Sequence, residues 1–172
     1  MGEAHADQIR ERIRSTSLAS GDPVTLDFRG IESASASWLK RVFNPFFADP
    51  VSDEGFGCEL SPVLLNVEAT DLKEDLADHL EGKGRVLILA QDTGKSLRFA
   101  KLFGRMERAA AETFQELCAL KESTAQQFYE RHPDRTTNQT AWNNRLAQLV
   151  DLRLARRRRE GRLWVYQPVI TV

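Results

Sequence analysis

The residues best suited to chemistry lie near the C-terminal end, where four arginines stand together and a fifth follows a Glu-Gly pair. The run "RRRREGR" covers residues 156–162, and the alternating stretch "LWVYQP" follows it. A tight turn at Glu-Gly between two such stretches predicts a β-hairpin, because glycine adopts positive φ at little cost. Arginines on such a hairpin suit phosphate oxygens. The candidate phosphate contacts are Arg157, Arg158, Arg159 and Arg162.

Other residues of this stretch are expected to be structural. Aliphatic and aromatic side chains alternate along "LWVY", with the two-residue period of a strand. We expect Trp164 and Tyr166 to pack inward and hold the hairpin in place, and Trp142 to be a core residue too. Arg156 lies next to the packed strand, so we expect it to serve as scaffold rather than to touch a ligand.

A helix with one polar side is expected just before the hairpin. Trp142, Leu146 and Leu149 recur there at helical spacing. Asparagine on the opposite side can pair with adenine through two hydrogen bonds. The alternative is that these polar residues are merely solvated. The candidate DNA-contacting residues in and just before this helix are Thr137, Asn138, Gln139, Thr140, Asn143 and Asn144.

Two further helices are expected upstream. "RMERAAAETFQELCAL" places its apolar residues on one helical face. "STAQQFYERH" opens with a capping box in which Ser123 is the N-cap and Gln126 stands three residues on. Three helices followed by a basic hairpin therefore make up the C-terminal part of the chain.

This order resembles the bacterial winged helix-turn-helix regulators, over about residues 104–170. The matching stretch is "TAWNNRLAQLVDLRLARRRREGRLWVYQPV". The resemblance implies a third helix that enters the major groove of double-stranded DNA and a hairpin that acts as the wing. One departure is Arg153, which stands where these regulators often carry glycine, a residue that tolerates a left-handed helix cap better.

Charge divides the chain into two parts. Residues 1–103 carry 12 basic and 17 acidic side chains, whereas residues 104–172 carry 12 and 8. The basic part suits a polyanion. In the acidic part, strand-like runs alternate with helix-like runs, which predicts a small α/β layer with at least partly parallel strands. The strand-like runs cover residues 23–28, 61–69 and 82–90, and the helix-like runs cover residues 35–47 and 71–80.

The acidic part resembles STAS-like domains, which are related to bacterial anti-sigma-factor antagonists. The resemblance covers about residues 8–92 and rests on "LDFRGIESASAS" and "LNVEATDLKEDL". It implies a protein partner of the ATPase or kinase type. In the antagonists a serine at the helix start is phosphorylated, and here Ala36 occupies that column between Ser35 and Ser37. These two serines are therefore possible phosphorylation sites, and the alternative is that they only cap the helix.

Several function classes are not expected. The three histidines and two cysteines have no metal-ligand spacing, and there is no GxSxG motif. We expect no enzyme activity, no catalytic residue, no cofactor and no metal. Cys58 and Cys118 stand far apart with no CxxC spacing, so we expect a reduced, cytoplasmic protein. No apolar run approaches the roughly 18 residues that span a membrane, so we expect no membrane partner.

The expected fold class is α/β for a STAS-like domain over residues 1–95, joined to an α+β winged helix-turn-helix domain over residues 104–172. The expected function is DNA binding, in a transcription regulator or a DNA-binding accessory protein, with the first domain used for partner sensing or homodimer formation. The alternative is a partner-switching module for protein–protein interaction, whose winged helix binds protein.

Overall fold

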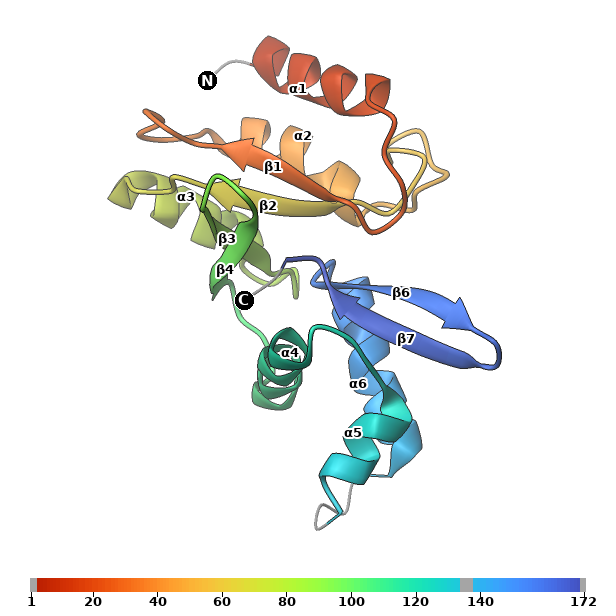
Figure 1. Ribbon diagram of the computed structural model, residues 1–172. Helices are drawn as coiled ribbons and strands as arrows, with labels where there is room; N and C mark the ends of the chain where they lie inside the picture. The colour runs from red at the N-terminus through yellow and green to blue at the C-terminus, as the bar shows by residue number, and fades with distance from the viewer. Residues whose placement is uncertain (1–2, 134–137, 171–172) are drawn as a thin grey trace.

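Two β-sheets, each packed on helices, organise the chain (Figure 1). This computed structural model describes residues 3–133 and 138–170. The helices are α1 (Glu3–Ser15), α2 (Ala36–Phe47), α3 (Thr70–Leu80), α4 (Arg108–Leu120), α5 (Ala125–Arg131) and α6 (Gln139–Asp151). The strands are β1 (Pro23–Asp27), β2 (Ser61–Leu65), β3 (Leu87–Asp92), β4 (Leu97–Phe103), β5 (Ser123–Thr124), β6 (Ala155–Glu160) and β7 (Leu163–Pro168).

The first sheet holds β1, β2, β3 and β4 in that spatial order. The first three strands run parallel, and β4 returns antiparallel to β3. Parallel neighbours need a crossover between them, which α2 and α3 supply. The expected mixed α/β fold with partly parallel strands is confirmed for this part of the chain.

The strand β4 was not expected from the sequence. Its residues alternate only weakly in burial, so the run "LRFAKLF" lacks the continuous apolar character of β2. It pairs with β3 along its length and extends the first sheet to Phe103, past the boundary expected at residue 95. The first sheet and the C-terminal helices are therefore joined by a very short connection.

Helices cover both faces of the first sheet, and successive side chains along β2 and β3 point to opposite faces. Leu64, Leu87 and Leu89 belong to the core shared with α1, α2 and α3. Val63 and Ile88 belong to a second core cluster that continues into the C-terminal helices. Figure 1 shows α1, α2 and α3 on one side of the sheet and α4 and α6 on the other.

The second core cluster joins the two parts of the chain. It runs from the first sheet through the fully buried side chains of Phe114, Phe128 and Trp142 to Tyr166 in β7. The rings of Phe99 in β4 and Phe114 in α4 meet edge to face, with 5.5 Å between centroids. The burial expected for Trp142 and Tyr166 is confirmed. A shared core of this kind holds the two sheets in one orientation.

The C-terminal part contains α4, α5 and α6 with a small sheet in the order β5, β7, β6. The β6–β7 hairpin pairs Glu160 with Leu163, so Gly161 and Arg162 form the turn, one residue later than expected. Gly161 has φ of +59°, as such a turn requires.

The capping box of α5 differs from the one expected. Its N-cap is Thr124, whose side chain accepts a hydrogen bond from the Gln127 amide, while the Gln127 side chain accepts one from the Thr124 amide. The assignment of Ser123 and Gln126 was wrong by one residue, because Ser123 lies in β5 and pairs with Tyr166 in β7.

Arg153 and Arg156 tie the base of the hairpin to the first part of the chain. Arg153 adopts a left-handed φ of +62°. Its buried guanidinium donates to the carbonyl of Phe46 at 3.0 Å and forms an ion pair with Glu59 at 3.0 Å. Arg156 lies 3.9 Å from Asp22, which agrees with the scaffold role expected for it.

Candidate nucleic-acid interface

The first turn of α6 presents polar side chains to solvent. Asn138 is its N-cap, and the Asn138 side chain accepts a hydrogen bond from the Ala141 amide at 2.8 Å. Gln139, Thr140 and Asn144 are exposed. Thr137 lies outside the described residues. Asn138 thus has a structural task, whereas the other three side chains can reach a ligand.

Asn143 is partly engaged inside the protein. Its side-chain carbonyl accepts a hydrogen bond of 2.9 Å from the Tyr166 hydroxyl of β7, and the residue is half-buried. Because adenine recognition by asparagine needs both amide atoms, this contact competes with that role. The contact also fixes the hairpin against α6. Arg145, on the same helix, stacks its guanidinium over the Trp142 ring at 4.9 Å.

One face of the β6–β7 hairpin combines two arginines with an indole ring. Arg157 pairs directly with Tyr166 across the two strands, and Arg159 pairs with Trp164, so these four side chains share a face. The Arg157 and Arg159 guanidinium carbons lie 4.5 Å and 5.7 Å from the Trp164 ring centroid. Stacking of this kind orients a guanidinium without neutralising its charge.

The expectation that Trp164 packs inward was wrong. It is 37% exposed, because it stands near the tip of the hairpin, beyond the reach of the core that buries Tyr166. Burial raises the pKa of the Tyr166 hydroxyl, and the nearby Arg157 opposes that rise. The two aromatic residues thus share a face of the hairpin and have different surroundings.

The opposite face of the hairpin holds Arg158 in ion pairs. Its guanidinium lies 3.2 Å from Glu122 and 2.8 Å from Glu160. These carboxylates compete for the positive charge that a phosphate would need. Arg162 lies in the exposed turn at the hairpin tip. Among the four candidate arginines, Arg157, Arg159 and Arg162 are therefore better disposed toward an anion than Arg158.

A groove of about 270 Å³ lies between α5, α6 and the hairpin. Gln139, Thr140 and Asn143 line it from α6, and Arg162 and Trp164 line it from the hairpin. Thr124 and Gln126, at the start of α5, line it as well and were not among the candidates. The signal that could have found them is their position at a helix N-terminus, where backbone amides attract anions.

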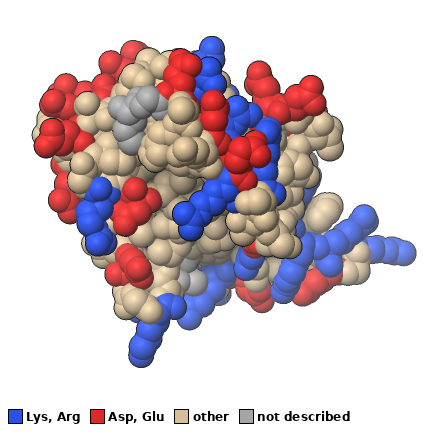
Figure 2. Space-filling view, turned by 90° about the horizontal axis from the view of Figure 1, so that it is seen from above, with Lys and Arg blue, Asp and Glu red and all other residues tan. Residues whose placement is uncertain are grey.

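Positive charge gathers on the projecting hairpin. Figure 2 shows Lys and Arg side chains along the lobe at the right, which is the place of the β6–β7 hairpin in Figure 1. Acidic side chains are spread over much of the remaining face in that view. The asymmetry of charge along the sequence is thus also an asymmetry in space.

Among the described residues, no three His, Cys, Asp or Glu side chains gather closely enough to hold a metal ion. Cys118 is buried, and burial raises the pKa of its thiol to about 12. Within the same residues, no helix is long and apolar enough to cross a membrane.

Comparison with known proteins finds one family. Residues 5–49 match the family described as "STAS-like domain of unknown function (DUF4325)". No curated protein and no solved structure matches the chain. The matched residues comprise most of α1 together with β1 and α2, so the comparison bears on the first part of the chain and not on the hairpin.

The two candidate phosphorylation sites lie in the matched region, at the start of α2. Ser35 is the N-cap of this helix, and its hydroxyl accepts a hydrogen bond from the Trp38 amide at 3.3 Å. Ser37 is exposed in the first turn, with its hydroxyl 3.2 Å from that of Ser35. The capping alternative is therefore realised by Ser35, whereas the Ser37 hydroxyl makes no contact that the cap requires.

Proposed function

We propose that residues 104–172 form a winged helix-turn-helix that binds double-stranded DNA. The observation that carries this proposal is the groove between α5, α6 and the hairpin. Gln139 and Thr140 line it from α6, Arg162 and Trp164 line it from the hairpin, and Arg157 and Arg159 stack on the same Trp164 ring. Bases are read by polar side chains at the start of a recognition helix, and phosphates are held by arginines beside it.

In this proposal the start of α6 enters the major groove. Gln139 and Asn144 are the residues that read base edges, because their side-chain amides are exposed at the first two turns. Asn143 holds the hairpin through Tyr166 instead. Arg157, Arg159 and Arg162 contact the backbone of the DNA, with Trp164 keeping the first two extended.

The protein acts as a transcription regulator or a DNA-binding accessory protein, and it binds as a homodimer. One recognition helix contacts only a few base pairs, so two copies on paired half-sites supply the specificity that one lacks. The STAS-like part provides the dimer contact or the surface that senses a partner. Its rigid core connection to the C-terminal helices gives such sensing a physical route.

The test is a salt titration of binding to a random DNA duplex, followed by fluorescence anisotropy. The plot of log affinity against log salt should fall steeply, with a slope of about −0.9 for each phosphate contact. Replacing both Arg157 and Arg159 by alanine should reduce the steepness by about 1.8. Affinity should fall by a similar factor on every sequence, since these side chains do not read bases.

The matched control is Arg158→Ala, which removes one arginine charge from the same strand, where each removed phosphate contact would lower the slope by about 0.9. Because Glu122 and Glu160 already balance Arg158, this variant should leave the slope nearly unchanged. Equal effects of the Arg158 variant and the double variant would refute the assignment of the binding face. Undetectable binding at low salt would refute DNA binding itself.

The alternative function is protein-interaction partner switching, and the STAS-like match favours it. Here a kinase-type partner would modify Ser37, which is exposed and not needed for the helix cap. Phosphate near the start of α2 would be stabilised by the helix dipole. Mass spectrometry after incubation with kinases of the source cell tests this, and peptides that stay unmodified at both serines would count against it.

A further inference from the structure

An apolar groove separates α1 from β1, one of the two edge strands of the first sheet. α1 packs on α2, where Arg41 forms ion pairs with Glu3 and Asp7, and this contact holds α1 away from β1. The space left between them has a volume of about 510 Å³, within the usual range for small-molecule sites.

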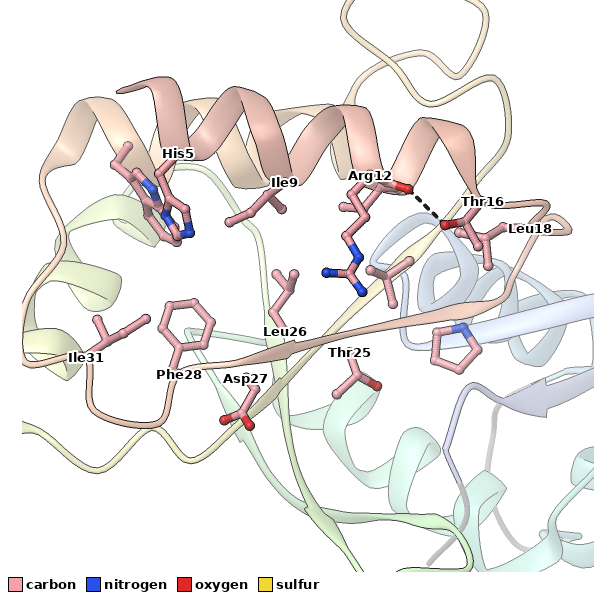
Figure 3. Close-up of a pocket in the computed structure, with 14 residues that line it drawn as sticks. His5, Ile9, Arg12, Thr16, Leu18, Thr25, Leu26, Asp27, Phe28 and Ile31 are labelled. Carbon is pink, nitrogen blue, oxygen red and sulfur yellow. Dashed lines mark hydrogen bonds between the residues drawn. The ribbon is translucent and has the colours of Figure 1, made fainter. Parts of the chain in front are cut away.

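The lining of this groove is mostly apolar. Figure 3 shows Ile9 pointing down from α1, with Leu26 and Phe28 pointing up from β1 into the same space. Ile31 closes one end, and Leu18 lies at the other. Thr25 and Asp27 point away on the far side of β1, as alternation along a strand requires. A ligand here would bury hydrocarbon on three sides.

One cation enters this apolar space. The guanidinium of Arg12 hangs from α1 into the groove, between Ile9 and Leu18 (Figure 3). Two nearby arginines already form ion pairs: Arg14 pairs with Glu11, and Arg41 pairs with Glu3 and Asp7. Among the described residues, Arg12 has no ion-pair partner. It thus offers a positive charge beside an apolar surface.

The groove is long and has different ends. His5 and Arg12 both line it, and seven residues of helix place them about 10 Å apart. At the His5 end the ring stacks on Trp38, which also lines the groove and is 2% exposed. The charged end and the aromatic end are therefore separated by an aliphatic stretch.

From these features we propose that the α1–β1 groove binds an elongated apolar carboxylate. The carboxylate pairs with Arg12, and the hydrocarbon chain lies along Ile9, Leu26 and Phe28 toward Trp38. Charge complementarity favours this class over a neutral lipid, and the length of the groove favours it over a small anion. The inference is independent of DNA binding, because every residue it uses lies in the first part of the chain.

The test uses decanoate as the probe and the full chain labelled with nitrogen-15. Three tryptophans give three indole N–H resonances, and only Trp38 lines the groove. Decanoate should shift the Trp38 resonance and leave those of Trp142 and Trp164 in place. Decanol, which lacks the charge, should bind about tenfold more weakly or worse.

Two variants and one control sharpen the result. Arg12→Gln should weaken decanoate about tenfold while leaving decanol unchanged, and Ile9→Trp should fill the groove and abolish both. Arg98→Gln removes an exposed cation from β4 and should bind like the wild type. Because Arg12 is exposed, its replacement should not disturb the fold.

Three results would overturn the proposal. The first is a Trp38 resonance that stays in place up to the solubility limit of decanoate. The second is equal binding of decanoate and decanol that Arg12→Gln does not change. The third is a dimer in sedimentation that Arg12→Gln and Ile9→Trp dissociate, which would show that a second copy fills the groove.

Discussion

Arg153 offers the sharpest test of how the two parts of the chain are joined. Its left-handed φ of +62° is a conformation that costs a non-glycine residue about 1–2 kcal/mol. Its guanidinium in return donates to the Phe46 carbonyl at 3.0 Å and pairs with Glu59 at 3.0 Å. The residue is 9% exposed, so the hydrogen bond is made in a largely dry environment.

The magnitude follows from these two opposing effects. Arg153→Ala keeps the left-handed φ and loses both contacts, so it should lower the free energy of unfolding by about 2–3 kcal/mol. Arg153→Gly loses the same contacts but removes the backbone strain, so it should be about 1 kcal/mol more stable than the alanine variant. Both variants should remain less stable than the wild type.

Urea denaturation followed by circular dichroism and tryptophan fluorescence measures these differences. Glu59→Gln is the matched control, because it removes only the ion pair and keeps the backbone. Since Glu59 is 42% exposed, that loss should stay below about 1 kcal/mol. A glycine variant as stable as the wild type would refute the reasoning, because the contacts to Phe46 and Glu59 would then only offset the backbone strain and give no net stabilisation.

The remaining predictions concern stability. Burial lowers the pKa of His79 from 6.5 to about 4, so the fold holds the ring neutral while the unfolded chain protonates. The stabilisation that comes from the neutral His79 ring should be complete above pH 6.5. The free energy of unfolding should fall by up to about 3 kcal/mol as the pH drops toward 4. His79→Phe, measured by urea denaturation at both pH values, should lose this dependence. Thr124→Ala should lower the free energy of unfolding by about 1 kcal/mol because it removes the N-cap of α5, and the urea midpoint should fall accordingly. If Ser123→Ala lowered the midpoint and Thr124→Ala did not, the cap assignment would be wrong. Gly21→Ala should cost about 1–3 kcal/mol, because Gly21 has φ of +86° and a Cβ there would lie 2.6 Å from the Arg156 Cβ; an unchanged melting temperature would count against that close approach.

Helices and buried strands could be predicted because their signals are local. The apolar spacing of Trp142, Leu146 and Leu149 marks α6, and the continuous apolar run of residues 61–65 marks β2. β4 could not be predicted, because it is an edge strand with a half-solvated face. Its sequence therefore shows neither a continuous apolar run nor a clean alternation of apolar and polar residues. β5 has two residues and exists only through its pairing with β7.

The sequence predicted which residue types make up the candidate site, and strand pairing decided which of those residues are disposed toward a ligand. Arg157 and Arg158 are neighbours of the same type, and no sequence pattern separates them. Strand register places Arg157 opposite Tyr166, on the side of α6, and Arg158 opposite Val165, where Glu122 can reach it. The exposure of Trp164 has the same origin, because the hairpin carries it beyond the edge of the core.

By itself, the sequence determined the alternation of strands and helices in the acidic part and the helices and basic hairpin of the C-terminal part. It also carried the resemblance of the acidic part to STAS-like domains. These depend on periodicity, turn chemistry and composition, which act over a few residues. Only the tertiary structure decided that the two parts share a core, that Arg153 bonds to Phe46, and that a groove lies between α1 and β1. Such features join residues far apart in the chain, and their energies depend on packing distances that no local pattern encodes.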